Sequence, residues 1–410
     1  MITVGEARER LLTRVRSWSN AWPSETVSLS EAGGRIVAES VRAPIDVPHF
    51  DNSAMDGFAV RASETTTASK ANPVRLDLAG TTQAGDLSLT LSSPRTSIQI
   101  MTGAPIPKGA DAVVPKEVVR EGTGWIELSD PVATGRFIRP RGGDVREGEI
   151  VASIGARVTV GLAGILASIG IRKVQVAKLP KVSVIVTGRE LVMDPKDLRE
   201  GKTFESNSVI LGQALREIGC PVQRLERVGD DLDETIEKIG QALEESDLLL
   251  VTGGVSVGEH DVTREALARL GVEELFWRVA QKPGKPIYAG FQGKRLILAL
   301  PGNPFAVFTC FYMYARPAIL TLMGATDVDL RCRTVPLLSE TPRSDSRAQW
   351  LKGKLVREGE RWGAVPLTHQ DSHLLSSLKE AEVLIFIPEG DQPIREGGRC
   401  PGIRTSVVKN

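Results

Sequence analysis

The stretch Asp247-Leu-Leu-Leu-Val-Thr-Gly-Gly-Val-Ser-Val-Gly-Glu-His-Asp261 decides the fold, because an apolar strand here runs directly into a glycine-rich loop. Four apolar residues bounded by Gly253 and Gly254 predict a core strand of an α/β sheet. Loops that follow such strands lie at the carboxyl edge of the sheet, where ligands bind. Glycines let backbone N–H groups approach an anion, so we assign Gly253, Gly254 and Ser256 to substrate binding. Asp261 either holds a metal ion or only caps the following helix.

The segments around this stretch alternate between strand and helix. The predicted elements are a strand over 182–186, a helix over 206–218, a strand over 222–228 and a helix over 232–243. Such alternation predicts a parallel, doubly wound sheet with right-handed crossovers. Two more short strands, over 286–291 and 295–300, precede a long apolar helix that begins near Asn303-Pro304 and ends by Gly324. These elements define one α/β domain.

The rest of the chain has a different pattern. Thr3 with Glu6 predicts a capping box and an amphipathic helix, and Ser28 with Glu31 predicts a second short helix. Between Pro44 and Gly148 short alternating strands predominate, and helical spacing returns over 157–170. After residue 330 short strands, such as 383–387, predict a small β-barrel or sandwich. The predicted domains are a helical linker domain (1–45 and 147–178), an inserted β-rich domain (46–146), an α/β domain (179–328) and a C-terminal β domain (329–410).

Composition excludes several classes of partner. Lys+Arg and Asp+Glu both number 51, so the chain has no basic footprint for nucleic acid or an anionic membrane. The four cysteines lack paired spacing, which argues against a zinc site or a disulfide framework. The N-terminus lacks the apolar core of a secretory signal, and the longest apolar run, Phe305–Ala315, is too short to cross a bilayer. We therefore expect a cytoplasmic protein.

Acidic side chains follow three of the predicted strands, at Glu190, at Asp230-Asp231 and at Asp261. The carboxyl ends of parallel strands share one edge, so these acids can converge on one crevice. Carboxylates beside glycine turns suit Mg²⁺, which uses one or two carboxylates together with substrate phosphate. Asp230 and Asp261 are the candidate metal ligands, whereas Asp231 is expected only to cap a helix.

Two proline-glycine loops supply candidate anion-binding groups. The segment Gln281-Lys-Pro-Gly-Lys-Pro-Ile287 places Lys282 and Lys285 on a stiff turn, which is either an oxyanion or phosphate clamp or a solvated turn. In Leu300-Pro-Gly-Asn-Pro-Phe305 the second proline begins a helix, whose N–H groups and positive dipole end can face an anion. Both loops adjoin the same predicted sheet edge.

Five motifs in chain order resemble one family. They are Asp51-Asn-Ser-Ala-Met-Asp-Gly-Phe-Ala-Val60, Met101-Thr-Gly-Ala-Pro-Ile-Pro107, Thr252-Gly-Gly-Val-Ser-Val-Gly-Glu-His-Asp261, Lys282-Pro-Gly-Lys-Pro286 and Leu300-Pro-Gly-Asn-Pro304. This combination resembles the molybdopterin molybdenumtransferases, called MoeA in bacteria and the E domain of gephyrin in animals. The likeness covers nearly the whole chain.

The resemblance implies an elongated homodimer of four-domain chains, with a molybdopterin-binding α/β domain and an active site shared between subunits. It implies insertion of molybdate into adenylylated molybdopterin, with release of AMP and with Mg²⁺ present. A molybdopterin adenylyltransferase is then a possible partner. The implied catalytic residues are Asp56, Thr102, Asp144, Glu190, Asp230 and Asp261. The implied substrate-binding residues are Arg139, Lys282, Pro301, Pro304 and Ser372.

Three positions depart from the family pattern. Arg278 stands where many members carry lysine, Lys352 stands where the family has an arginine, and Asp371 replaces a glycine before Ser372. We retain Arg278, Lys285 and Lys352 as candidate substrate-binding residues. Two other functions remain open: a scaffold of the gephyrin E-domain type, and a molybdopterin adenylyltransferase-like nucleotide enzyme. The choice between molybdate and tungstate is also open.

Overall fold

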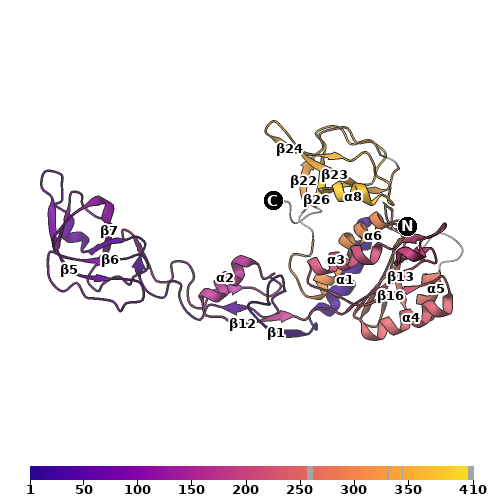
Figure 1. The fold of residues 1–410 in the computed structure, drawn as a ribbon, viewed down its shortest axis with the longest axis horizontal. Coiled ribbons are helices and arrows are strands. Elements are labelled where there is room, and N and C mark those ends of the chain that lie inside the picture. The colour runs from indigo at the N-terminus through magenta and orange to yellow at the C-terminus, as the bar shows by residue number, and fades with distance from the viewer. Residues whose placement is uncertain (256–261, 330–331, 344, 405–410) are drawn as a thin grey trace.

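The computed structural model describes residues 1–255, 262–329, 332–343 and 345–404. The molecule is elongated (Figure 1), with a β-rich unit at one end and a small linking unit in the middle. At the other end an α/β unit and a C-terminal β unit lie side by side. The predicted multidomain fold, α/β plus β, is confirmed.

The α/β unit is built on a six-stranded sheet of order β16-β13-β17-β21-β20-β18. Its parallel strands are β13 (Val182–Thr187), β16 (Val222–Val228), β17 (Leu248–Thr252) and β21 (Arg295–Leu300). Two antiparallel strands, β18 (Glu273–Trp277) and β20 (Tyr288–Gln292), complete it. The chain leaves β13 for β16 on one side and returns to β17 on the other, so a topological switch point lies between β13 and β17.

Helices cover both faces of this sheet. They are α3 (Asn207–Glu217), α4 (Leu232–Glu245) and α5 (Val262–Arg269), followed by the long apolar helix described below. Residues of β13 alternate between two apolar cores: Val184 and Val186 lie in the core that contains α3, and Ile185 lies in the core that contains α4. The sheet is therefore doubly wound, as predicted. The loop after β13 carries short strands β14 (Leu191–Val192) and β15 (Thr203–Phe204) and a 3₁₀ turn, η3 (Pro195–Asp197).

The first helix, α1 (Val4–Ser19), begins with the predicted capping box between Thr3 and Glu6. Its apolar face, including Leu11, lies in the core that contains α3. Packing therefore joins α1 to the α/β unit, although our boundary at residue 45 groups it with the linker domain. Helix α1 joins this unit because the apolar stripe along one of its faces packs in the same core as the long helix of the α/β unit.

The predicted apolar helix consists of α6 (Pro304–Cys310), a π-helical turn η4 (Phe311–Ala315) and α7 (Arg316–Leu322). Pro317 has no N–H to donate to the carbonyl of Met313, and Arg8 of α1 donates to that carbonyl instead. The helix continues past Arg316 and ends at Leu322, in agreement with the predicted end by Gly324. By length and composition Pro304–Leu322 could cross a membrane, but 89% of its most apolar window is buried inside the protein, as in a core helix.

The linking unit contains one helix and four strands among the described residues: α2 (Val160–Ser168), β1 (Ser24–Ser28), β2 (Val41–Arg42), β11 (Ile150–Ala152) and β12 (Lys173–Ala177). The predicted helix after Ser28 is wrong. The Ser28 hydroxyl does donate to the Glu31 carboxylate at 2.6 Å, but the chain turns back at Gly34, whose φ is 77°. The hydrogen bond between Ser28 and Glu31 therefore stabilises a turn that ends at the glycine pair Gly33-Gly34, and no helix begins there.

The β-rich unit has a six-stranded sheet of order β7-β4-β6-β5-β9-β8. Its strands are β4 (Gly57–Val60), β5 (Val74–Thr82), β6 (Thr96–Ile100), β7 (Ala112–Pro115), β8 (Val119–Gly122) and β9 (Trp125–Leu128), with 3₁₀ turns η1 (Ala62–Thr65) and η2 (Lys116–Val118). A separate pair joins β3 (Asn52–Ser53) to β10 (Ile138–Arg139).

The C-terminal unit is a sheet of order β19-β23-β25-β26-β22, with β24 paired to β23. Its elements are β19 (Gln281–Lys282), β22 (Cys332–Pro336), β23 (Ala348–Glu358), β24 (Arg361–Pro366), α8 (Leu375–Glu380), β25 (Val383–Ile387) and β26 (Arg399–Arg404). A bridge between Leu337 and Ala364 joins the two ends, so the sheet closes into a small barrel. Because β19 comes from the α/β segment, the two units share a sheet edge.

Candidate functional site

The loop after β17 lies at the switch point, where the sheet geometry favours ligand binding. Gly253 and Gly254 have φ of 84° and 65°. A Cβ on Gly253 would lie 2.4 Å from the carbonyl oxygen of Thr187, and one on Gly254 would lie 2.2 Å from the hydroxyl of Thr263. Only glycine fits at either position. Ser256 and Asp261, the other predicted residues of this loop, lie outside the described residues.

Two predicted acids lie at the same sheet edge. Glu190 follows β13 and is exposed, and Asp230 follows β16. Asp230 makes a loose ion pair with Arg189, at 3.8 Å between Nε and Oδ2, and half of its side chain is exposed. In the part of the chain that the structure describes, no group of three His, Cys, Asp or Glu side chains could hold a metal ion.

Asn207, the first residue of α3, fastens two of these loops together, and we did not predict its role. Its buried amide nitrogen donates to the Thr252 hydroxyl at 3.2 Å and to the Gly302 carbonyl at 2.8 Å. The end of β17 and the loop after β21 are therefore held at fixed spacing. No sequence motif marks Asn207 except its position at the start of a predicted helix.

A cavity of about 490 Å³ lies between the α/β unit and the C-terminal barrel. Among its lining residues are the four predicted residues Lys282, Lys285, Pro301 and Ser372, together with Arg347 and Asp371. Lys282 and Lys285 belong to residues 282–286, which we call the lysine turn. Residues from three separate segments thus line one cavity, and its wall carries more cationic than anionic side chains. Arg347, which we did not predict, is held by a bidentate pair with Asp345, at 2.6 Å and 3.0 Å.

The start of α6 is tied to the C-terminal barrel. Pro304 occupies the first turn of α6, as predicted. The backbone N–H of Phe305 donates to the Ser372 carbonyl at 3.0 Å, and the Asn303 amide donates to the Ser372 hydroxyl at 2.8 Å. One of the helix N–H groups that we expected to face an anion is therefore occupied by Ser372. Asp371 stands where the resemblance implies a glycine, and Ser372 beside it lies on the cavity wall.

Lys352 lies behind the cavity and not on its surface. Its side chain has no exposed area, and its ammonium group donates to the Asp371 carbonyl at 3.0 Å and to the Ser377 hydroxyl at 2.6 Å. The same group lies 4.6 Å from the centre of the Phe305 ring. Burial lowers the pKa of Lys352, and the charge of Asp371 partly offsets this effect. Lys352 is placed to support the wall, in contrast to the direct substrate contact that we expected.

Arg278 also lies away from the cavity lining. Its guanidinium stacks on the Trp277 ring at 3.7 Å, and its backbone is left-handed with φ of 67°. Its buried Nε has no hydrogen-bond partner among the described residues. Arg264 also lies over this ring, with its guanidinium carbon 4.1 Å from the ring centre.

The remaining predicted residues lie in the β-rich unit. Asp56 precedes β4 and accepts hydrogen bonds from both the hydroxyl and the backbone N–H of Thr102, each at 2.7 Å. These two bonds, the hydroxyl first, lower the pKa of Asp56. Arg139 pairs with Asn52 between β10 and β3, and Asp144 is exposed nearby in the chain. Within one chain the linking unit separates this group from the sheet edge of the α/β unit (Figure 1).

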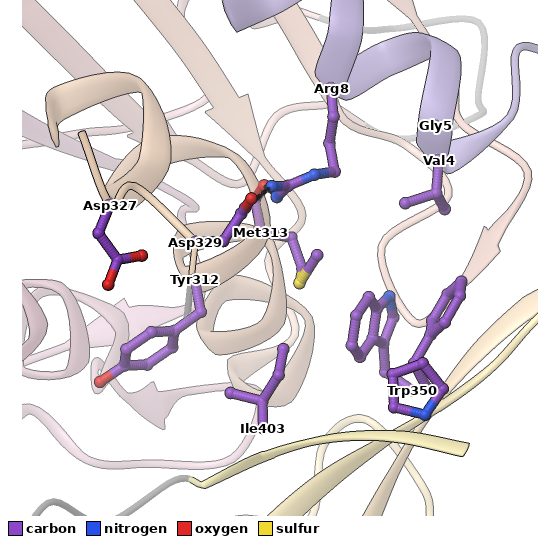
Figure 2. A pocket seen from close by; sticks show the side chains of 11 residues that line it. Val4, Gly5, Arg8, Tyr312, Met313, Asp327, Asp329, Trp350 and Ile403 are labelled. Atoms are coloured by element: carbon purple, nitrogen blue, oxygen red, sulfur yellow. Dashed lines mark hydrogen bonds and ion pairs between the residues drawn. The ribbon is translucent and has the colours of Figure 1, made fainter. Parts of the chain in front are cut away.

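A second cavity, of about 560 Å³, contains none of the predicted residues. It lies between the start of α1, the π-helical turn and the C-terminal barrel, and Tyr312, Met313 and Trp350 are among the residues that line it (Figure 2). Its wall is mainly apolar, apart from Asp327 and the ion pair of Arg8 with Asp329. The π-helical turn thus has one face toward this cavity, while Tyr314 points to the lysine turn.

Comparisons with known proteins agree across the whole chain. Residues 2–170 match the MoeA N-terminal region (domain I and II), residues 183–321 match a probable molybdopterin binding domain, and residues 334–401 match the MoeA C-terminal region (domain IV). The chain is 33% identical to the molybdopterin molybdenumtransferase of Bacillus subtilis, over 95% of this chain and 91% of the relative. It is 34% identical to molybdopterin molybdenumtransferase 2 of Mycobacterium tuberculosis, over 89% of this chain and 91% of the relative.

A crystal structure of a molybdopterin biosynthesis MoeA protein from Pyrococcus horikoshii OT3 has the same fold, with a TM-score of 0.82 and 30% identity. The match covers 98% of this chain and 100% of that one. All regions of the chain, and not the α/β unit alone, therefore have counterparts in these relatives. The chain belongs to the molybdopterin molybdenumtransferase family.

Proposed function

We propose that this protein inserts molybdate into the dithiolene of adenylylated molybdopterin and releases AMP. The observation that carries this proposal is the cavity that groups Lys282, Lys285, Pro301 and Ser372. Its wall includes the loop after β21, which Asn207 ties to the end of β17. Its cationic wall suits an oxyanion or a phosphate, and the glycine loop after β17 suits close approach of a nucleotide. The family relationship supplies the identity of these anions.

We propose Mg²⁺ as the metal ion at the sheet edge, with Asp230 as one carboxylate ligand and Asp261 as the second. The exposed carboxylate of Asp230 and its loose contact with Arg189 leave it able to bind a cation. Mg²⁺ commonly keeps several waters and uses substrate phosphate as a ligand, so two protein carboxylates suffice. When bound, the ion would offset the negative charge of the phosphate groups during cleavage.

We also propose that the active enzyme is a homodimer whose site combines the α/β unit of one subunit with the β-rich unit of its partner. This arrangement accounts for the separation of Asp56 and Thr102 from the cavity in one chain. Helix α2 supports it, because Val160 is 93% exposed and added Cβ atoms at Gly161 and Gly164 would meet open space. An apolar helix with small residues on an open face is typical of an interface. We further propose that the enzyme is cytoplasmic. The free thiols Cys220, Cys310 and Cys400 are consistent with a reducing compartment. An adenylyltransferase in the same compartment would supply its substrate.

The deciding experiment follows AMP release from adenylylated molybdopterin by the purified protein. Release should require both molybdate and Mg²⁺, and omission of either should reduce it to background. Release that proceeds equally without molybdate would indicate a nucleotide hydrolase instead. Binding of the pterin nucleotide with no turnover under any condition would favour the scaffold.

A further inference from the structure

A buried hydrogen-bond network lies directly beneath the lysine turn. The hydroxyl of Tyr314 donates to Gln281 Oε1 at 2.7 Å, and Gln281 Nε2 donates to the Gly284 carbonyl at 3.1 Å. The same Nε2 lies 3.5 Å from the sulfur of Cys310. Gln281, Tyr314 and Cys310 have no exposed surface. Solvent therefore offers none of these polar groups an alternative partner, and each bond that is lost leaves an unsatisfied buried atom.

The network fixes the orientation of the Gln281 amide. The Gly284 carbonyl can only accept a hydrogen bond, so it selects Nε2, and Oε1 is left to accept from the Tyr314 hydroxyl. The turn rests closely on these atoms. A Cβ added to Gly284, whose φ is 97°, would lie 2.5 Å from Gln281 Nε2 and 2.6 Å from the Cys310 sulfur. The middle of the lysine turn thus sits on a platform made by one amide and one thiol.

Both ends of the turn are held through their backbone by contacts that do not involve this platform. At its start, β19 pairs with β23, and Arg347 donates to the Gln281 carbonyl at 3.4 Å. At its end, the Val279 N–H donates to the Lys285 carbonyl at 3.1 Å. The Gln281 amide donates to the carbonyl of Gly284, which lies between the two lysines in the chain. Tyr314 comes from the π-helical turn, a feature often found near functional sites.

We propose that Gln281 and Tyr314 are positioning residues, which set where the ammonium groups of Lys282 and Lys285 meet an oxyanion of the substrate. The nature of that oxyanion, molybdate or a phosphate of the pterin nucleotide, rests on the proposed function. The positioning itself rests on the contacts above. Sequence patterns do not indicate it, since a glutamine before a Pro-Gly turn and a tyrosine in an apolar helix are each unremarkable alone.

The test compares Tyr314→Phe and Gln281→Met with the control Tyr312→Phe. Tyr312 belongs to the same π-helical turn, but its hydroxyl donates to Glu217 at 2.6 Å and its ring faces the other cavity. Each test variant should raise the KM for molybdate or for the pterin nucleotide about three- to tenfold and leave kcat within about twofold, because binding to both ground and transition states weakens. The substrate whose KM rises identifies the oxyanion. The control should leave both KM values unchanged.

A second readout does not depend on activity. Burial raises the pKa of the Cys310 thiol to about 12, so a thiol reagent should label it very slowly in the native protein. If the platform loosens, Cys310 should be labelled faster in both test variants, while Cys220 stays protected. Mass spectrometry of the labelled peptides separates the two thiols.

The double variant tests whether the two residues act as one unit. Because the Tyr314 hydroxyl acts through the Gln281 amide, the effects of the single changes should not add. Unchanged KM values together with unchanged Cys310 labelling would overturn the proposal. Equal effects of Tyr312→Phe would also overturn it, since they would show a general loss of packing. If Gln281→Met fails to fold, Tyr314→Phe, which removes one oxygen atom, decides the question. If wild-type protein shows no molybdate-dependent AMP release, the proposed function fails while Cys310 labelling still judges the positioning.

Discussion

The ammonium nitrogen of Lys352 lies 2.6 Å from the hydroxyl oxygen of Ser377, at a position without exposed surface. This bond and the one to the Asp371 carbonyl fasten the segment 371–377 to β23. Ser372 within that segment then holds the start of α6. A buried charge thus supports the cavity wall from behind, at the cost of its own hydration.

Stability should depend on pH through Lys352. The pKa of Lys352 in the folded protein lies below its ordinary value of 10.5. At a pH between these two pKa values, the unfolded chain therefore binds more protons than the folded one. The free energy of unfolding contributed by this group must therefore rise as the pH increases through the folded pKa toward 10.5. Relative to Lys352→Met, the wild-type melting temperature should increase from neutral pH to about pH 10. A difference that stays constant over this range would show that Lys352 does not titrate abnormally.

The Asp56 carboxylate should become a stronger base when its hydroxyl partner is removed. Thr102→Val deletes the hydroxyl but keeps the backbone N–H bond, so the pKa of Asp56 should rise toward, without reaching, 3.8. A carbon-detected NMR titration of the carboxyl group measures this shift. The acid limb of AMP release should move in the same direction, because Asp56 would protonate at higher pH. Thr134→Val, a threonine that bonds Asp111 instead, is the matched control.

The strands were the most predictable part of the structure. The predicted ranges 222–228 and 383–387 coincide with β16 and β25. In β16 apolar residues are spaced among polar ones between Pro221 and Gly229, whereas β25 is a continuous apolar run that ends at Pro388. The loops Gly253-Gly254 and Lys282–Pro286 were found for a similar reason, since glycine and proline mark them locally. Local sequence signals do not predict the role of a residue when its contacts come from a distant segment of the chain. The burial of Lys352 depends on a loop about twenty residues later, and the role of Gln281 depends on Tyr314.

Lys282 should contribute salt-dependent affinity for anions. Lys282→Ala should weaken binding of the pterin nucleotide about tenfold at low ionic strength, as expected for loss of a charge-assisted bond. The loss should shrink as salt rises, because screening already weakens the native contact. Lys294→Ala is the control, since Lys294 is exposed in the turn between β20 and β21. Equal affinity of Lys282→Ala and wild-type protein at low salt would assign Lys282 to a solvated turn.

The final prediction concerns how two chains build one site. Asp56 belongs to the β-rich unit and Asp230 to the edge of the α/β unit, at opposite ends of the elongated chain (Figure 1). If the site is shared across a two-fold axis, Asp56→Asn and Asp230→Asn homodimers should each be inactive, since every site carries one changed residue. A heterodimer of the two variants has one site with both changes and one with neither. Each purified heterodimer should therefore regain about half of the wild-type activity.

The control is a heterodimer of Asp56→Asn with Asp144→Asn, two changes that both lie in the β-rich unit. In this pair each shared site receives one altered β-rich unit, so activity should stay at background. A site built within one chain predicts a different pattern, in which the Asp56→Asn and Asp230→Asn heterodimer is as inactive as its parents. Two affinity tags isolate the mixed species, and AMP release in the tagged fraction then distinguishes a shared site from a separate one in each subunit.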